Sequence, residues 1–483
     1  MVDLGSNSVK MVCYSADHTG AYRPYHRESA KIRLDEYDDG VIHQGPADQL
    51  VDMLKHFHNI IQYEEVGRVL AVATSAVRRA ANRGPLLARI RDETGFAFEV
   101  LSGDEEALCS YAGAATHLDI PTCIFFDIGG GSLEIVSSRN HAVTRALSIP
   151  LGALVATRRF AGYSDFDGDS IRRLRAYVRE SLPPPESLGS LGRDTVLVGV
   201  GGTVRAIARY AQSYESYPLR KLHNYMMAGR LLRDVTIDIL SRDRHILAQM
   251  YEIGAGRADI IKAGAVIVSE VMDWFGLDAM RVCSTGLREG VLAFAGRYPE
   301  IGLHGISAYH VRELVRAPSW APRMPSSEAG VVRTMSSSGL LSGEEHTILR
   351  AAAANLEWLR TFRDADDFLY RMLDGTSALS HRAQLLSTLC LAYAKKPKRT
   401  RLLMRRYGPL LRPDDLRLIR RISPILLLCD MAIIAGAELH LEAGNGRLLL
   451  RVDRNERIIP GAIFSQQCRS VGEALGVATE CNC

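Results

Sequence analysis

Two short segments of the sequence combine aspartate, glycine and serine at the same spacing, and this combination suits a metal–phosphate complex. Asp3–Ser8 has the sequence DLGSNS and Asp127–Ser132 has the sequence DIGGGS, which share the pattern D-[IL]-G-x-x-S. Glycine lets the backbone approach a ligand closely, and successive N–H groups of a tight turn form a concavity that binds anions. Because an aspartate repels phosphate, its position beside such a turn predicts a hard cation such as Mg²⁺ between them.

Further acids and one arginine could complete such a site. Glu134 follows Asp127 by seven residues, so a strand–turn–strand would let both carboxylates face one phosphate; the alternative is a glutamate facing solvent. The segment Ser102–Glu106 begins a helix with three acids. The helix dipole alone favours acids there, but a carboxylate could also orient or deprotonate an attacking water. Arg78 could grip phosphate through a forked pair of donors, or lie on the surface.

Two more glycine turns lie further along the chain. Val198–Ile207 combines a strand, a glycine turn and a helix, which directs a helix N-terminus toward an anion. Its spacing matches neither the dinucleotide-binding fingerprint nor a P-loop. Ser284–Gly290 predicts a similar turn into a last helix of the second domain.

The elements that must position these residues alternate between apolar strands and amphipathic helices over about the first 290 residues, which indicates an α/β fold. The expected strands include Val69–Ala73, Ile124–Asp127 and Val196–Gly199, and the expected helices include Gly84–Asp92 and Glu105–His117. The two D-[IL]-G-x-x-S segments lie 124 residues apart, about one domain length. We therefore expect two related domains that face each other across a cleft.

The third part of the chain has a different pattern. Prolines and serines from Pro318 to Ser338 suggest a linker. Long helical patterns follow at 346–362, 377–394 and 414–428, and a hairpin is expected for Glu438–Glu442 and Arg447–Asp453 around Gly444-Asn445-Gly446. This part is therefore expected to be mostly α-helical.

Composition favours a folded globular chain over a disordered one, and no segment is expected to span a membrane. The 483 residues are 47% hydrophobic and 24% charged with a net charge of +4, as in a soluble protein of several domains. Ile422–Leu441, the most apolar stretch, is interrupted by charged residues and indicates a buried helix. Nine cysteines without a CxxC pair, and no signal peptide, predict a cytoplasmic location. Only Met1 and Val2 precede Asp3, so we expect the natural chain to begin further upstream.

Seven motifs, taken in order, resemble the exopolyphosphatase / guanosine pentaphosphate phosphohydrolase family of the actin-like superfamily. They are DLGSNS (3–8), ATSAVRRAAN (73–82), LSGDEEA (101–107), FFDIGGGSLEI (125–135), GVGGTVRAIA (199–208), RADIIKAG (257–264) and STGLREG (284–290). The resemblance covers about residues 1–295. It implies an α/β fold with two actin-like (ribonuclease-H-like) domains, 1–118 and 119–298, that flank a cleft, followed by a mostly α-helical domain, 299–483.

The resemblance also implies roles for individual residues. Glu106 is the implied catalytic base, and Asp127 and Glu134 complete the catalytic set by holding Mg²⁺ and the nucleophilic water. Asp3 matches the acid of the first phosphate loop, so the implied metal set is Asp3, Asp127 and Glu134. The implied phosphate contacts are Gly5, Ser6, Asn7, Ser8, Arg78, Gly129, Gly130, Gly131 and Ser132.

The activity that follows from this resemblance is Mg²⁺-dependent release of orthophosphate from the end of inorganic polyphosphate by a homodimer. Hydrolysis of guanosine pentaphosphate (pppGpp) would use the same machinery and stays an alternative. An ATP-dependent kinase or chaperone of the same superfamily is disfavoured by the SGDEEA glutamate. A non-catalytic binder of polyphosphate is disfavoured by the retained acids.

The C-terminal part departs from long family members, which carry a His-Asp phosphohydrolase-like domain. No His-Asp dipeptide occurs here, and His310, His346 and His381 lack metal-ligand spacing, so a degenerate domain of this kind is expected. Residues 395–421 contain eleven Lys/Arg and two Asp, a net charge of +9. Such a stripe could hold polyphosphate or nucleic acid, or be a solvated helix face; its scarcity of aromatic residues makes nucleic acid the less favoured ligand.

Overall fold

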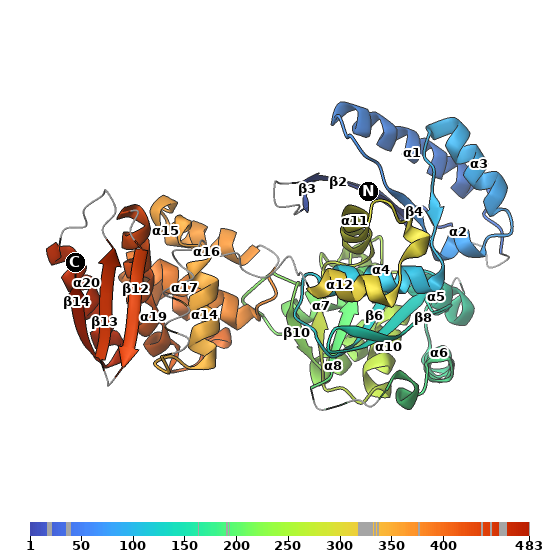
Figure 1. Cartoon of the computed structure of the whole chain (residues 1–483). Coiled ribbons are helices and arrows are strands. Elements are labelled where there is room, and N and C mark those ends of the chain that lie inside the picture. The colour runs from blue at the N-terminus through green and yellow to red at the C-terminus, as the bar shows by residue number, and fades with distance from the viewer. Residues whose placement is uncertain are drawn as a thin grey trace. The chain divides into compact units, whose positions relative to one another are not determined.

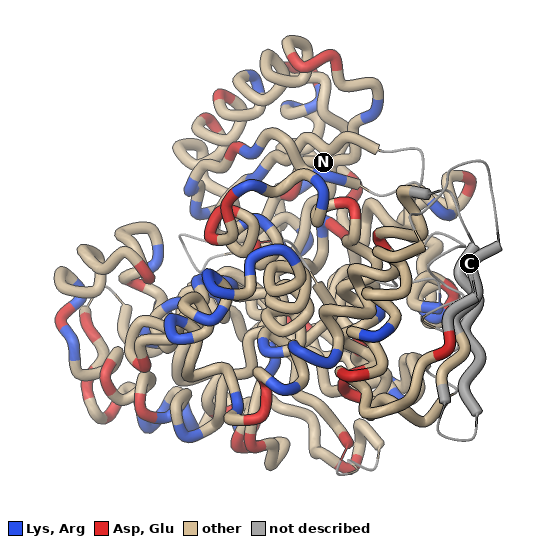
Figure 2. Tube along the Cα trace, turned by 90° about the vertical axis from the view of Figure 1, so that its left-hand side faces the viewer, with Lys and Arg blue, Asp and Glu red and all other residues tan. Residues whose placement is uncertain are grey.

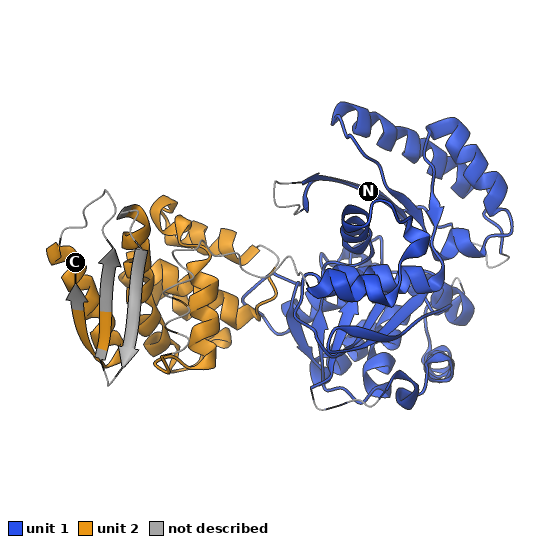
Figure 3. Cartoon of the chain, in the orientation of Figure 1, with its two compact units in different colours: residues 1–319 blue, residues 320–483 orange. Residues whose placement is uncertain are grey.

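The structure, a computed structural model, describes residues 1–16, 22–34, 40–162, 164–189, 192, 194–316, 332, 335, 338–374, 377–435, 438–444, 447–453 and 461–482. Contacts divide the chain into two compact units, Met1–Ser319 and Trp320–Cys483 (Figure 3). The predicted boundaries at 118/119 and 298/299 remain predictions, and most of the predicted linker lies outside the described residues. Among the described residues, no helix is long and apolar enough to cross a membrane.

The first sheet of unit 1 contains five strands in the order β3-β2-β1-β4-β5. β1 (Val2–Leu4), β2 (Val9–Ala16) and β3 (Tyr22–Ala30) form an antiparallel meander. β4 (Ala71–Ala73) pairs in parallel with β1, and β5 (Glu99–Val100) pairs in parallel with β4. The helices of this part are α1 (Gln44–Tyr63), α2 (Ser75–Arg79) and α3 (Arg83–Thr94).

The second sheet repeats this topology. Its strands are β6 (Cys123–Ile128), β7 (Leu133–Arg139), β8 (Ala142–Ile149), β9 (Val196–Val200), β10 (Tyr225–Ala228) and β11 (Ala279–Val282). The run β8-β7-β6-β9-β11 has the same order and the same pairing directions as β3-β2-β1-β4-β5, and β10 adds one antiparallel edge strand. The predicted pair of ribonuclease-H-like α/β folds is therefore confirmed.

Helices cover both faces of the second sheet (Figure 1). One face packs on the apolar sides of α5 (Ala153–Ala161), α6 (Gly168–Ser181), α7 (Gly202–Tyr214), α8 (Gly229–Ser241) and α10 (Ile261–Trp274), with α9 (Arg244–Gln249) beside them. The other face shares a core with residues of the first sheet and with α4 (Gly103–Ala115), α11 (Leu287–Arg297) and α12 (Ala308–Arg316). The first sheet buries its remaining face against α1 and α3. Below, residues 1–100 are the first lobe and residues 103–297 are the second lobe.

The helices α4 and α11 cross at a point where only glycine fits. A Cβ on Gly113 would lie 1.9 Å from the carbonyl oxygen of Gly286, and a Cβ on Gly290 would lie 1.8 Å from the carbonyl oxygen of Cys109. Backbone therefore packs directly on backbone, which fixes the two helices against each other. Both helices begin at the cavity described below, so this crossing also fixes the residues of their first turns.

Unit 2 is mostly helical, as predicted. Its helices are α14 (Gly343–Ala353), α15 (Glu357–Thr361), α16 (Ala365–Asp374), α17 (His381–Lys395), α18 (Pro397–Arg406), α19 (Asp415–Ala435) and α20 (Gly461–Leu475). The predicted hairpin is confirmed as β12 (Glu438–Gly444) and β13 (Arg447–Asp453), joined by a parallel strand β14 (Ala478–Asn482). Asn445 and Gly446 of its turn lie outside the described residues.

Two helix predictions in this region were wrong in extent. The pattern at 346–362 forms two helices rather than one, since the Asn355 side chain donates a hydrogen bond to the carbonyl of Ala351 (2.9 Å) and competes with the helical backbone. The apolar stretch Ile422–Leu441 is helical only as far as Ala435. From Glu438 it is strand, consistent with its alternating apolar positions.

Candidate active site

The two glycine turns are equivalent hairpins of the two sheets. In each, the first turn residue donates its N–H to the carbonyl of the last: Gly5 to Ser8 (3.1 Å) and Gly129 to Ser132 (3.0 Å). A Cβ on either glycine would lie 3.5 Å from that serine carbonyl oxygen. The strands before both turns end beside one cavity, so the predicted internal repeat places both anion-binding turns at a single site.

The turns also touch each other. A Cβ on Gly130 would lie 3.3 Å from the Cβ atoms of Ser6 and Asn7. The Ser6 hydroxyl and the Asn7 side-chain oxygen are buried without a hydrogen-bond partner in the described part of the chain. Both residues line the cavity. Since a buried polar atom without a partner is costly, a polar ligand is expected beside them.

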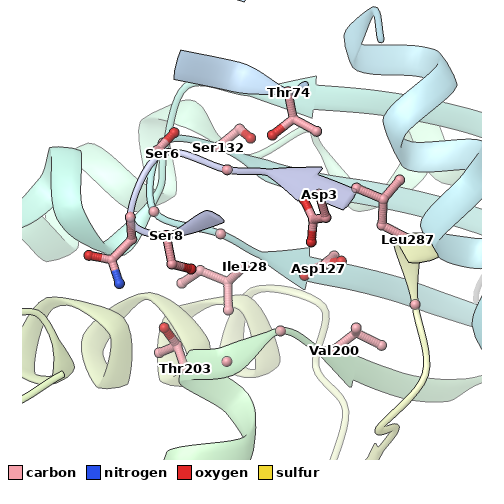
Figure 4. A pocket seen from close by; sticks show the side chains of 18 of the residues that line it. Asp3, Ser6, Ser8, Thr74, Asp127, Ile128, Ser132, Val200, Thr203 and Leu287 are labelled. Atoms are coloured by element: carbon pink, nitrogen blue, oxygen red, sulfur yellow. The ribbon is translucent and has the colours of Figure 1, made fainter. Parts of the chain in front are cut away.

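Four carboxylates line this cavity: Asp3, Glu106, Asp127 and Glu134. Figure 4 shows Asp3 and Asp127, one from each lobe, pointing toward one another. Asp127 and Glu134 lie opposite each other on β6 and β7, which confirms that the two carboxylates share a strand–turn–strand. Asp127 accepts a hydrogen bond from the Ser110 hydroxyl (2.8 Å), and Glu134 accepts one from the Ser148 hydroxyl (2.8 Å).

The acids raise each other's pKa. Burial is the main cause that raises the pKa of Asp127, and the nearby Asp3 carboxylate adds to it. Burial likewise raises the pKa of Glu134 well above its usual value, with further contributions from Glu106 and Asp127. Crowded carboxylates that lose solvent favour their neutral forms, and a cation among them would restore their charge.

Glu106 lies in the first turn of α4, and its neighbour Glu105 explains the acidic start of that helix. Glu105 forms a capping box with Ser102, in which its carboxylate accepts the Ser102 N–H (2.7 Å) and the Ser102 hydroxyl accepts the Glu105 N–H (3.2 Å). Glu106 makes no such cap; it is 7% exposed and lines the cavity. The capping explanation therefore accounts for Glu105 and leaves Glu106 available for chemistry.

Arg78 contacts Glu106 instead of lining the cavity. Its Nη1 donates to Glu106 Oε2 (2.8 Å) and to the carbonyl of Leu101 (2.7 Å). Burial raises the pKa of Glu106 to about 7, although Arg78 opposes the shift. The structure thus shows Arg78 orienting the Glu106 carboxylate, while its contact with phosphate remains a prediction.

Four basic residues complete the cavity wall, and none of them was among the predicted site residues. They are Lys10, Arg205, Arg257 and Arg288. None of the four forms an ion pair with an acid among the described residues. Burial lowers the pKa of Arg205 to about 10, helped by Arg288 and Arg257, and burial lowers the pKa of Lys10 with the same arginines contributing. An anion would relieve this repulsion.

The third glycine turn brings α7 to the cavity, as its sequence predicted. Gly201 has a φ of 106°, which favours glycine, and a Cβ there would lie 2.4 Å from the Ile128 carbonyl oxygen. A Cβ on Gly202 would lie 2.2 Å from a guanidinium nitrogen of Arg257. The two glycines therefore let the α7 N-terminus and the Arg257 side chain reach the end of β6.

Most of the predicted site residues meet at this cavity. Those that line it are Asp3, Gly5, Ser6, Asn7, Ser8, Glu106, Asp127, Gly129, Gly130, Gly131, Ser132 and Glu134. The missed Lys10 had a signal in the sequence, since it follows Asp3 by seven residues as Glu134 follows Asp127. The missed arginines lie in motifs singled out for their glycines, but only the folded chain shows where their side chains point.

Comparison with known proteins identifies relatives of unit 1. The model of the Ppx/GppA phosphatase family matches residues 12–295. Exopolyphosphatase 1 of Mycobacterium tuberculosis (strain H37Rv) is 29% identical over 298 residues, covering 60% of this chain and 86% of the relative. Exopolyphosphatase 2 of the same strain is 28% identical over 312 residues, covering 61% of this chain and 98% of the relative.

Solved structures show the same fold. An exopolyphosphatase from Cytophaga hutchinsonii has a TM-score of 0.58 at 23% identity, covering 64% of this chain and 98% of that chain. A Ppx/GppA family member from Aquifex aeolicus has a TM-score of 0.51 at 25% identity, covering 60% and 94% respectively. The family match ends before unit 2.

Proposed function

The chain belongs to the Ppx/GppA phosphatase family, and from this premise we propose that it hydrolyses the terminal phosphoanhydride bond of inorganic polyphosphate and releases orthophosphate. One observation carries the proposal: a single cavity joins two anion-binding turns, four carboxylates and four basic side chains that form no ion pair with an acid in the part of the chain that the structure describes. A cavity that offers both acids and bases suits a substrate that carries several phosphates and a cation.

Glu106 is the proposed general base. Its carboxylate is held by Arg78 and borders the same cavity as both turns. With a pKa raised to about 7, it can be ionised at neutral pH and still accept a proton efficiently. We infer that it takes the proton from the water that attacks the terminal phosphorus, while the turns hold that phosphate in place.

Magnesium is the proposed cofactor, held by Asp127 and Glu134 with Asp3 nearby. The buried acids fit it, because burial and mutual repulsion raise the pKa values of Asp127 and Glu134. No three carboxylate, imidazole or thiol groups in the described part of the chain are placed to enclose a metal. Mg²⁺ usually takes one or two protein carboxylates and completes its shell with water and phosphate oxygens, and Asp127 and Glu134, opposite each other on β6 and β7, would supply two. When bound, it would neutralise phosphate charge.

The basic residues of the cavity support polyphosphate as the substrate. Lys10, Arg205, Arg257 and Arg288 can bind the phosphates that follow the terminal one. The described lining residues include no aromatic side chain, on which a nucleobase would stack. The two mycobacterial relatives are named exopolyphosphatases, which supports polyphosphate rather than pppGpp as the substrate.

The basic segment 395–421 is a weaker candidate for polyphosphate binding than its charge suggests. Lys395 donates to the carbonyls of Leu359 and Phe362 (2.8 Å each). Other cations of this segment form ion pairs inside unit 2: Arg399 with Asp366, Arg412 with Glu344, Arg417 with Asp414 and Arg421 with Glu345. Over the described chain as a whole, Lys and Arg alternate with Asp and Glu along the trace (Figure 2). Polyphosphate binding by the segment 395–421 remains a prediction, and so does dimerisation of the chain.

Phosphate release by the purified chain tests the proposed function. With Mg²⁺ present, we expect orthophosphate from long-chain polyphosphate at a higher kcat/KM than from pppGpp, and we expect chelation by EDTA to stop release from both. Faster release from pppGpp would replace the proposed substrate with the nucleotide. Phosphate transfer from ATP to another acceptor, without release from polyphosphate, would contradict hydrolysis altogether.

A further inference from the structure

Two of the arginines that line the cavity, Arg257 and Arg288, each have an acid close by on the same segment. Asp259 follows Arg257 by two residues, and Glu289 follows Arg288 directly. Both acids contact side chains of the first lobe, although both arginines belong to the second lobe. Asp259 is also 3.7 Å from Arg244 of its own lobe. The proposed phosphate-binding arginines are thus next to contacts that connect the lobes.

The first contact joins Arg33 to Asp259. The Arg33 guanidinium donates to the Asp259 carboxylate, whose side chain is 9% exposed. Lys31 of the first lobe lies 3.9 Å from the same oxygen. The residue after Arg33, Leu34, donates its N–H to the carbonyl of Ser6 in the first glycine turn (3.1 Å). The dipeptide Arg33-Leu34 therefore contacts both the first glycine turn and Asp259, the acid two residues after Arg257.

The second contact joins Tyr14 to Glu289. The Tyr14 hydroxyl donates to one carboxylate oxygen of Glu289 (3.1 Å), and the other oxygen accepts the N–H of Gly286 at the start of α11 (2.9 Å). Tyr14 lies on β2, the strand that also carries Lys10. This contact connects the strand that carries Lys10 to the helix turn that carries Arg288.

We propose that Arg33, Asp259 and Tyr14 are positioning residues, which set the distance between the first glycine turn and the arginines of the second lobe. The inference rests on the proposed function, because the ligand that it concerns is a phosphate chain that spans both lobes. Neither Arg33 nor Asp259 lines the cavity. Their loss should weaken binding of the phosphate chain without changing how the bond is broken.

A mutant cycle with tripolyphosphate as the probe tests this inference. Arg33→Ala and Asp259→Asn should each raise the Kd, measured by calorimetry, and the KM by about tenfold, with kcat changed less than about twofold. The double variant should bind no worse than the poorer single variant, since the two residues act through one contact. Arg33→Lys should recover part of the affinity. Tyr14→Phe removes only the hydroxyl that contacts Glu289 and should also raise the Kd.

Arg172→Ala is the matched control, because it breaks an exposed ion pair with Asp169 on α6 and should change neither constant. Variants with lower melting temperatures but an unchanged Kd for tripolyphosphate would overturn the inference. It would also be overturned if the fold-increase in Kd of the double variant equalled the product of the two single fold-increases. A wild-type chain that binds tripolyphosphate but releases no phosphate would overturn the proposed function, while the binding comparison would still decide the positioning role. Absence of binding to the wild-type chain would overturn both.

Discussion

Replacing Glu106 with Gln should lower kcat for phosphate release by about 10²–10⁴-fold, the usual contribution of a general base. Glutamine keeps the size of the side chain and an oxygen that can accept the hydrogen bond from Arg78. It cannot take a proton from water at neutral pH. Binding of polyphosphate to the variant should therefore stay close to that of the wild-type chain, as measured by calorimetry beside the phosphate-release assay.

Glu105→Gln is the control for this prediction. Glutamine also supports a capping box, and Glu105 does not line the cavity, so α4 should keep its start and activity should change by less than about twofold. For the wild-type chain, kcat/KM should rise with pH through about 7, where Glu106 loses its proton, and this rise should be absent in Glu106→Gln. Full activity of Glu106→Gln would remove this residue from catalysis.

Asp127→Asn should lower kcat/KM by about a hundredfold, since a metal ion contributes several kcal/mol of charge stabilisation and about 1.4 kcal/mol corresponds to a factor of ten. Asparagine retains the size of the side chain and an oxygen for the Ser110 hydroxyl, so the fold of the β6–β7 hairpin should persist. It lacks the negative charge that would hold Mg²⁺. The Mg²⁺ concentration for half-maximal activity should therefore increase.

The measurement is a Mg²⁺ titration of phosphate release for the wild-type chain and the variant. Asp119→Asn serves as the control, because Asp119 is an exposed acid in the loop before β6 and does not line the cavity. Its Mg²⁺ requirement should match that of the wild-type chain. An unchanged requirement in Asp127→Asn would contradict Asp127 as a ligand.

The local parts of the site could be predicted from sequence because they depend on residues close in the chain. A strand, a four-residue glycine turn and a second strand determine that Asp127 faces Glu134. The repeat of the pattern at Asp3 then places two such turns in related folds. The same spacing places Lys10, seven residues after Asp3, opposite Asp3. The position of Lys10 was therefore also predictable from the repeat.

Other features depend on packing between distant segments and could not be predicted. The contact between Arg78 and Glu106 arises because α2 and α4 begin side by side at the ends of neighbouring strands. Arg257 reaches the cavity only by passing over Gly202, a residue 55 positions earlier in the sequence. Sequence patterns indicate which glycines are needed for close approach, but not which side chain occupies the space.

The helices of unit 2 could likewise be predicted only where they depend on residues close in the sequence. Helical periodicity predicted elements of unit 2 correctly where the apolar pattern continued, as in α17 (His381–Lys395). It overlooked the competing side-chain hydrogen bond of Asn355, which accompanies the break between α14 and α15. The high positive charge of 395–421 also suggested an open ligand surface, whereas contacts such as that of Arg421 with Glu345 occupy part of it.

A crystal structure of Glu106→Gln with tripolyphosphate and Mg²⁺ tests the central claim most directly. We expect the terminal phosphate to contact both turns, 5–8 and 129–132, and the following phosphates to lie along Lys10, Arg205, Arg257 and Arg288. We also expect the cation to contact the Asp127 and Glu134 carboxylates. Phosphates bound elsewhere, with both turns empty, would contradict the proposed site.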